Sequence, residues 1–263
     1  MFLVDSHCHL DQLDLTPYEG QLDRVLGQAR EAGVGYILNV CIDLIHFPQV
    51  LAIAKQYPRW VGASIGLHPN EPEETELTKK LLHLAQDEQV IAIGETGLDY
   101  YRSEGDLDWQ RDRFREHIRV AQQLHKPLIV HARQAKEDTL RILQEENASA
   151  VKGVLHCFTE DWDMAQRAIE MGFYISFSGV VTFRNAKAVQ EVAECMPIER
   201  MLIETDAPYL APNPYRGKSN VPAYVRHTAE YIAKLRGVAV ERIAEQTTEN
   251  FFALFHGAQR PHV

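Results

Sequence analysis

Eight short runs of apolar and β-branched residues recur along the chain, and a segment with helical character follows each one. The runs are FLVDSHCHL (2–10), YILNVCI (36–42), WVGASIGLHP (60–69), VIAIGETGLDY (90–100), PLIVHAR (127–133), GVLHCFT (153–159), FYISFSGVVTF (173–183) and MLIETDAPYL (201–210). Most are apolar without strict alternation, as expected for parallel strands that helices cover. This alternation of strand and helix limits the fold most strongly, because it predicts a parallel sheet with helices packed around it.

Capping and stop residues mark several of the intervening helices. Thr16 followed by Pro17 predicts the start of a helix that ends at Gly33, since threonine is a favoured N-cap and proline a favoured first residue. Asp161 precedes the helical run WDMAQRAIEM, and Gly172 follows it. Further helices are expected over 109–124, 221–236 and 240–256.

The number of strand–helix units points to a closed barrel. Eight units in 263 residues, with no break in composition, predict an α/β fold of the (β/α)8 TIM-barrel type. Such barrels often form one domain of this length, so a single domain over 1–263 is expected. An open doubly wound sheet is the alternative. It has less support, because the turn after the first strand lacks a glycine-rich phosphate-binding loop.

Charge, cysteines and the N-terminus narrow the class of protein. The 27 Lys and Arg against 37 Asp and Glu give a net charge of −10, which argues against tight, sequence-independent binding of duplex nucleic acid. An acidic enzyme can still act on a phosphodiester if bound cations supply the local positive field. The four cysteines show no CxxC spacing and predict buried thiols in a reducing compartment. No signal peptide or membrane-spanning run is evident, so we expect a cytoplasmic protein without membrane contact.

Histidines gather at the ends of the expected strands, where TIM barrels carry their active sites. His7 and His9 lie two residues apart in the first strand, so they share a face and two imidazoles can converge on one metal ion. An isolated pair of this kind is also common on protein surfaces. His131 and His156 end the fifth and sixth apolar runs, and each by itself is more often a buried core residue than a ligand.

Two carboxylates complete the expected cluster. Glu95 follows the fourth run and lies between Gly94 and Gly97, glycines that leave room for the close approach of a ligand or metal. A strand-end salt bridge is the alternative for Glu95. Asp206 ends the eighth run on the same face as Glu204. Burying four histidines and two carboxylates in one barrel mouth without cations would be costly, so together they predict a metal site.

Counting the ligands predicts two ions. Six groups exceed the four that one tetrahedral zinc accepts, and a carboxylate such as Glu95 has two oxygens with which to bridge a pair of cations. A water between two ions loses a proton near neutral pH, because each ion lowers its pKa. Histidine and carboxylate ligands admit Zn²⁺, Mn²⁺, Mg²⁺ and Ni²⁺ alike, so the predicted cofactor is a pair of divalent ions of open identity.

Motifs along nearly the whole chain are those of a known family. They are VDSHCHLD, GLHP, GETGLDYY, KPLIVHAR, GVLHCFT, FYISFSGVVTFRNA, LIETDAPYLAP, YRGKSN and TTENFFALF. In these motifs the chain resembles the TatD-family metal-dependent hydrolases, and especially their YcfH-like bacterial branch. The combination is highly specific, and no metal position departs from the family pattern.

The resemblance implies a fold, a ligand set and an activity. It implies an amidohydrolase-like TIM barrel in which His7, His9, Glu95 and Asp206 hold one ion and Glu95, His131 and His156 hold the second. It implies a deoxyribonuclease that removes nucleotides 3′→5′ from single-stranded DNA, with RNA as a further possible substrate. It also implies that His68 lies in the substrate pocket, where it contacts a phosphate or the leaving group. A packed loop histidine is the alternative for His68.

The predicted mechanism is metal-assisted hydrolysis of a phosphoester. Asp206 would orient or deprotonate the attacking water and pass the proton to the leaving oxygen. Glu204 lies one layer deeper on the same strand face and is expected to support a ligand from behind. The predicted catalytic residues are therefore Asp206, Glu95 and His68.

Cations and aromatic residues near the strand ends are candidates for substrate binding. Arg133 and Arg216 could each bind phosphate oxygens in a forked geometry, and each could equally be a surface cation. The aromatic side chains that could stack on bases are Tyr100, Tyr101, Phe158 and Tyr209. Such residues more often pack against other side chains. Of these four, Tyr209 is the one that we predict to contact the substrate.

Two other interpretations of the sequence remain open. Hydrolysis of a small amide, a lactone or an aminoacyl ester is the alternative within the same fold, because fold alone does not fix the bond that is cleaved. A non-catalytic metal-dependent binding protein is the alternative from another class, and the spare carboxylate available as a base argues against it. Nothing in the sequence indicates an obligate protein partner.

Overall fold

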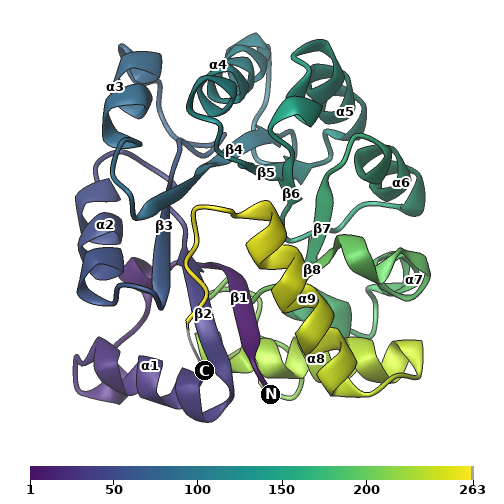
Figure 1. The fold of residues 1–263 in the computed structure, drawn as a ribbon. Coiled ribbons are helices and arrows are strands. Elements are labelled where there is room, and N and C mark those ends of the chain that lie inside the picture. The colour runs from purple at the N-terminus through teal and green to yellow at the C-terminus, as the bar shows by residue number, and fades with distance from the viewer. Residues whose placement is uncertain (262–263) are drawn as a thin grey trace.

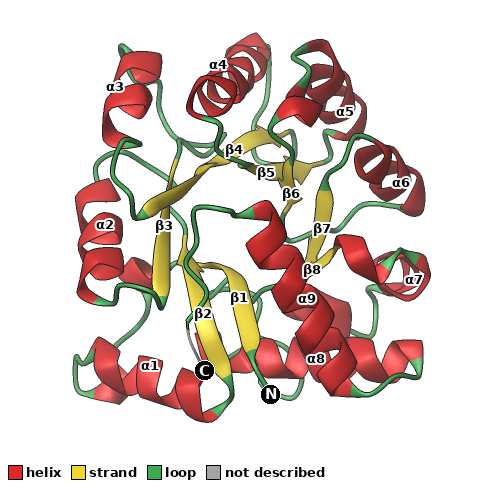
Figure 2. Cartoon of the chain, in the orientation of Figure 1, coloured by secondary structure: helices red, strands yellow, loops and turns green. Residues whose placement is uncertain are grey.

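The computed structural model describes residues 1–261, in which eight parallel strands follow one another around a barrel in chain order (Figures 1 and 2). They are β1 Leu3–Cys8, β2 Val34–Asn39, β3 Val61–Ile65, β4 Val90–Asp99, β5 Leu128–Arg133, β6 Gly153–Leu155, β7 Tyr174–Phe177 and β8 Met201–Ile203. The first and last strands close the barrel, because the Asp206 N–H donates to the His7 carbonyl at 2.9 Å and the His9 N–H to the Ala207 carbonyl at 2.8 Å. The predicted (β/α)8 TIM barrel is confirmed.

Helices surround the strands as a ring, and one more helix lies across one end of the barrel (Figure 1). The ring consists of α1 Leu22–Glu31, α2 Phe47–Gln56, α3 Leu77–Leu84, α4 Asp108–Leu124, α5 Lys136–Glu145, α6 Trp162–Glu170, α7 Lys187–Cys195 and α8 Val225–Arg236. The last helix is α9 Val240–Leu254. Within residues 1–261, no helix combines the length and the apolar character that crossing a membrane would require.

The helix signals in the sequence had mixed outcomes. Asp161 caps α6 as predicted, and its carboxylate accepts a hydrogen bond from the Met164 N–H at 3.0 Å. The helix start predicted at Thr16 is wrong. Thr16 begins a single 3₁₀ turn, after which Glu19 adopts a left-handed backbone with φ 56° and ends the turn. The first α-helix begins at Leu22 instead.

Apolar side chains fill the barrel and close the end at which the strands begin. The interior side chains are Val4, Tyr36, Leu38, Ile91, Ile129, Val154, Tyr174 and Leu202. Phe251, Leu254 and Phe255, from α9 and the residue after it, pack against this interior cluster. Alternate strand residues such as Leu3 and Ile37 pack outward under the helices. The functional polar side chains are therefore expected at the carboxyl ends of the strands.

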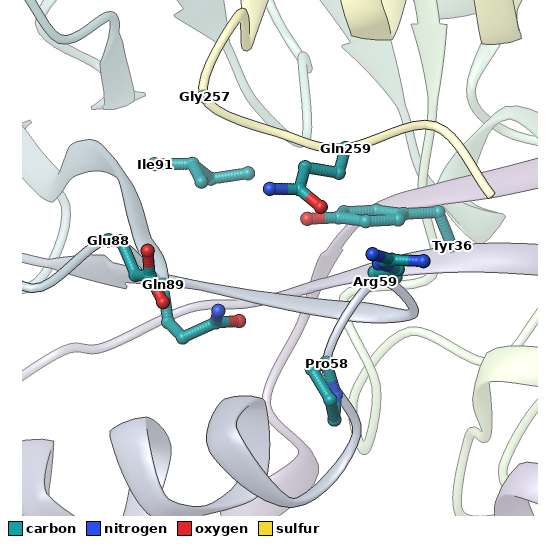
Figure 3. A pocket seen from close by; sticks show the side chains of 8 residues that line it. All are labelled: Tyr36, Pro58, Arg59, Glu88, Gln89, Ile91, Gly257 and Gln259. Carbon is teal, nitrogen blue, oxygen red and sulfur yellow. The ribbon is translucent and has the colours of Figure 1, made fainter.

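A cavity of about 270 Å³ lies at the end of the barrel where the strands begin (Figure 3). None of the predicted site residues lines it. It is lined by Tyr36, Pro58, Arg59, Glu88, Gln89, Ile91, Gly257 and Gln259. Most of these residues lie just before β3 and β4 or just after α9. In TIM barrels this face supports stability, whereas the chemistry lies at the carboxyl ends of the strands.

Candidate metal centre

The carboxyl end of β1 brings two imidazoles together. Both histidines are buried, and the register between β1 and β2 shifts between Asp5 and Cys8, around the first of them. The Nε2 atoms of His7 and His9 lie 3.3 Å apart. The Nδ1–H of His9 donates to the Val40 carbonyl at 2.9 Å, so Nε2 is the ring atom that faces the site and would bind a cation.

Glu95 lies at the centre of the site and contacts four histidines. Its Oε1 lies 2.8 Å from His156 Nε2, 3.0 Å from His131 Nδ1 and 3.4 Å from His68 Nε2, and its Oε2 lies 3.3 Å from His7 Nε2. Burial opposes ionisation, but the charge of His156, the nearby His68 and the hydrogen bonds from His131 and His156 hold the pKa of Glu95 well below its usual value. The two oxygens of one carboxylate thus face different imidazoles, three at Oε1 and His7 at Oε2.

The glycines beside Glu95 serve the backbone rather than a ligand. Gly94 and Gly97 have φ values of 143° and 133°. A Cβ on Gly94 would lie 2.5 Å from the Ile129 carbonyl oxygen, and one on Gly97 would overlap the His131 carbonyl oxygen. The room that we expected for a ligand or metal is therefore occupied by β5, whose close approach brings His131 to Glu95.

Asp206 faces the His7–His9 pair from the end of β8. Its Oδ1 lies 3.4 Å from His9 Nε2 and 3.7 Å from His7 Nε2. Burial opposes ionisation, but the hydrogen bond to His9 and the charge of His7 lower the pKa of Asp206. Its side chain is 14% exposed, against 4% for Glu95. Asp206 is therefore the carboxylate of the cluster that is open toward the mouth.

Two further carboxylates contact His131 and His156 at the ring nitrogens that face away from Glu95. Asp99 Oδ2 lies 3.3 Å from His131 Nε2 and accepts a hydrogen bond from the Asn70 side chain at 3.0 Å. Glu204 Oε1 lies 3.5 Å from His156 Nδ1. Each of these two histidines has one ring nitrogen toward Glu95 and the other toward a second carboxylate. This arrangement fixes ring orientation and increases the basicity of the inner nitrogen, as in many metal sites.

The donor set fits divalent cations. Three overlapping groups of side chains have possible ligand atoms within 4.8 Å of one another: His7, His9 and Glu95; His7, His156 and Asp206; and His68, Glu95 and His131. The rings of His7 and His156 are stacked with centroids 3.9 Å apart, and Glu95 and Glu204 raise the pKa of His156 well above its usual value although burial opposes protonation. The site thus draws a proton onto His156, whereas burial and the charge of His156 lower the pKa of His7. A bound cation would replace that proton.

The structure thus brings the six predicted ligands together and adds His68 to them. His68 was predicted as a catalytic and substrate-contacting residue and not as a ligand, yet it lies within the cluster, and its Nδ1 accepts the Asn70 N–H at 3.1 Å. Sequence reasoning missed Asn70 and the contact that Asp99 makes with His131. The one available signal was the position of Asn70, two residues after His68 in a strand-end loop.

The predicted substrate contacts are distributed around the mouth. Tyr209 is 52% exposed, and its hydroxyl donates to the Gln12 side chain at 2.8 Å. The guanidinium of Arg133 lies 4.0 Å from the centroid of the Tyr101 ring, and Tyr101 is 58% exposed. Arg216 lies 4.4 Å from the Phe183 ring.

Two of the four candidate stacking residues pack against the protein, which is the commoner role of strand-end aromatic residues. Phe158 is buried among the outer core side chains. The left-handed backbone of Cys157, with φ 44°, interrupts strand alternation after His156. The Tyr100 ring packs partly buried against the outer core, and its hydroxyl donates to Asp138 at 2.6 Å.

Comparison with known proteins identifies the family of this chain. The sequence model of the family described as TatD related DNase matches residues 4–256. The chain belongs to the TatD family. The metal-dependent hydrolase YcfH of Escherichia coli is 48% identical over 259 residues, which cover 97% of this chain and 96% of that protein. The 3′-5′ ssDNA/RNA exonuclease TatD of Erwinia tasmaniensis is 32% identical, with 93% and 97% covered.

Solved structures of TatD proteins share the barrel. YjjV, a TatD homologue from Escherichia coli, superimposes with a TM-score of 0.89 at 27% identity, covering 97% of this chain and 98% of that one. A TatD-family hydrolase from Entamoeba histolytica has a TM-score of 0.85 at 22% identity, covering 98% and 99%, which shows a common fold. This TatD-family chain is therefore a metal-dependent hydrolase, as its motifs predicted.

Proposed function

We propose that this hydrolase removes nucleotides from the 3′ end of single-stranded DNA, and of RNA, by hydrolysing phosphodiester bonds at a pair of divalent cations. The observation that carries the proposal is the position of Glu95. Its Oε1 faces His131 and His156 and its Oε2 faces His7, while Asp206 faces the His7–His9 pair from the mouth. The name of the Erwinia relative, a 3′-5′ ssDNA/RNA exonuclease, supports the choice of substrate.

The cations would be held by the buried donors of the barrel mouth. His7, His9, Glu95 and Asp206 would hold one ion, and Glu95, His131 and His156 the other, with Glu95 shared. When bound, such ions neutralise phosphate charge and lower the pKa of water. Zn²⁺, Mn²⁺, Mg²⁺ and Ni²⁺ all suit histidine and carboxylate donors.

Asp206 is the residue placed to move the proton. Its carboxylate is ionised, lies beside His7 and His9, and is partly open to the mouth. It would accept a proton from the attacking water and return it to the leaving 3′ oxygen of the next nucleotide. Glu95 keeps both oxygens against histidines and is not available for that task.

His68 would orient the substrate phosphate. Burial lowers the pKa of His68 to about 4, so the ring is neutral near pH 7. Because Nδ1 accepts the Asn70 N–H, the neutral ring carries its proton on Nε2, the atom that faces Glu95 at 3.4 Å. A neutral donor at this position can hydrogen-bond a phosphate oxygen.

The experiment is metal-dependent release of mononucleotides from end-labelled strands. A 5′-labelled single strand should shorten stepwise from its 3′ end in the presence of Mn²⁺ or Mg²⁺, and the EDTA-treated enzyme should leave it intact. A strand blocked with a 3′ phosphorothioate linkage is the matched control. If the loaded enzyme instead cleaves amides, lactones or aminoacyl esters and leaves DNA and RNA whole, the phosphodiester proposal is wrong.

A further inference from the structure

Acidic residues dominate one side of the barrel mouth. The loops that follow β1, β2 and β3 span residues 9–21, 40–46 and 66–76, and they contain no lysine or arginine. Their carboxylates are Asp11, Asp14, Glu19, Asp43, Glu71, Glu73, Glu74 and Glu76. Glu19, Glu74 and Glu76 form ion pairs with cations outside these loops, and the other five form none with lysine or arginine in the part of the chain that the structure describes. A polyanionic strand that reaches the metal centre would be repelled by this side.

The loop after β7 and the part of the loop after β8 that follows Glu204 and Asp206 have the opposite charge. Residues 178–187 and 207–224 contain no aspartate or glutamate, and their cations are Arg184, Lys187, Arg216 and Lys218. All four are exposed. Among residues 1–261, no carboxylate forms an ion pair with any of them. The charge of these four side chains is therefore available to a polyanion.

Direct contacts join these two loops into one surface, which we call the β7–β8 surface (residues 178–187 and 207–224). The Asn213 N–H donates to Thr182 Oγ1 at 2.9 Å, and the Asn213 side chain donates to the Thr182 carbonyl at 2.6 Å. Arg216 from the second loop lies over the ring of Phe183 from the first, which holds its guanidinium in place. The surface begins directly after Asp206 and includes the exposed ring of Tyr209, whose centroid lies 6.1 Å from that of His9.

We infer that the β7–β8 surface binds the sugar–phosphate backbone of the substrate strand, which therefore leaves the metal centre over β7 and β8 and not over β1 to β3. This inference rests on the proposed function, since it takes the substrate to be a single-stranded nucleic acid. Unpaired arginine and lysine bind phosphates without regard to sequence and make binding depend on salt. The 3′-terminal nucleotide lies at the metals, and the 5′ part of the strand runs along the cations.

The test neutralises two cations of the surface and compares them with two cations elsewhere. The test variant is Arg184→Gln/Lys218→Gln. The control variant is Lys234→Gln/Arg242→Gln, which removes the same charge from exposed positions on α8 and α9. The Mn²⁺-loaded enzymes are assayed on a single-stranded oligothymidylate about 12 nucleotides long, within the range that single-strand sites occupy, and on bis(4-nitrophenyl) phosphate, which has no extended backbone.

The expected result is a higher KM for the oligonucleotide in the test variant alone, with unchanged kinetics on bis(4-nitrophenyl) phosphate. The slope of log(1/KM) against log salt should become shallower by about 1.4, because each lost single-strand phosphate contact removes about 0.7. If the test and control variants keep the same KM and salt slope while both cleave the oligonucleotide, the β7–β8 surface does not bind the substrate backbone. The exonuclease proposal then still stands.

The two proposals can also fail in the other order. If wild-type enzyme cleaves no nucleic acid, the labelled oligonucleotide is titrated by fluorescence anisotropy in the same buffers. Suppose that binding depends on salt and is weaker in Arg184→Gln/Lys218→Gln but not in the control variant. This result would support backbone binding by the β7–β8 surface and refute the proposed exonuclease activity. Binding that both variants weaken equally would refute the surface.

Discussion

The Nδ1 atom of His156 lies 3.5 Å from Oε1 of Glu204, while Nε2 of the same ring lies 2.8 Å from Glu95. Glu204 is fully buried, and neither of its oxygens has a hydrogen-bond partner among the described residues. A buried carboxylate without such a partner is costly unless it holds a positively charged group nearby. Glu204 is therefore best explained as the residue that orients His156 toward the metals.

Replacement of Glu204 should weaken metal binding without touching a ligand. In Glu204→Gln the side-chain shape is kept and the charge facing Nδ1 is lost. Loss of a group that orients a metal ligand lowers metal affinity by about 10–100-fold. Calorimetric titration of the metal-free protein with Zn²⁺ measures this, with the exposed Glu199→Gln as control. Equal affinities in the two variants would contradict the role.

Removal of a direct ligand should have a larger effect. His131→Ala deletes a nitrogen that lies 3.0 Å from Glu95, and we expect metal affinity to fall by more than about 100-fold, beyond the loss from an orienting residue. Turnover should fall steeply, while the circular dichroism spectrum stays unchanged. Metal content by elemental analysis is the direct readout, and His256→Ala removes an exposed histidine as the control. Wild-type stoichiometry and turnover in His131→Ala would show that His131 is no ligand.

Asp206→Asn separates charge from backbone geometry. Asp206 has a left-handed backbone with φ 58°, a conformation that asparagine also tolerates. The variant should therefore fold normally while turnover falls by about 10²–10⁴-fold, as for loss of a general base. Rate measurements at saturating metal check this expectation. A near-wild-type rate would assign proton transfer to another group.

The sequence was sufficient to locate the site wherever strands are regular. His131 and His156 follow the interior residues Ile129 and Val154 by two positions, and both reach Glu95. Because parallel strands of a barrel end at one face, residues far apart in the chain could be assigned to one cluster from the sequence alone.

The remaining features depend on backbone irregularities and loop contacts that have no periodic signal. The left-handed backbone at Cys157 directs Phe158 into the outer core, and the left-handed Glu19 ends the turn begun at Thr16. The hydrogen bond from Asn70 to Asp99 joins two loops whose relative position only the folded barrel sets. Local pattern could not predict these features, because each is decided by tertiary packing.

Gly97→Ala should destabilise the barrel at the strand pair that supports the site. A residue other than glycine in an unfavourable positive-φ conformation costs about 1–3 kcal/mol, and at Gly97 the added Cβ would also overlap the His131 carbonyl oxygen. Gly105→Ala is the matched comparison, since Gly105 has φ 83° but nothing within 4 Å of the position that an added methyl group would take. Urea unfolding should show a larger loss for Gly97→Ala. Equal losses would mean that β5 can move away.

A buried histidine outside the metal cluster should make stability fall in acid. His117 lies on α4, where its Nε2 accepts the Leu67 N–H at 3.0 Å and its Nδ1–H donates to the Arg113 carbonyl at 2.8 Å. Burial lowers the pKa of His117 from 6.5 to about 4. Between those two values the unfolded chain binds a proton that the folded chain does not, so stability is complete above about pH 6.5 and declines as the pH falls toward 4.

The size of this effect can be isolated by substitution. A pKa difference of this size corresponds to about 3 kcal/mol of lost stability once the pH is below 4. In His117→Gln that contribution is absent, so the free energy of unfolding should change less between pH 7 and pH 4 than in wild type, even though the variant is less stable at pH 7. Urea midpoints are measured across this pH range, with His256→Gln as the control. If the curves of midpoint against pH ran parallel for wild type and His117→Gln, His117 would not be the cause of the loss of stability in acid.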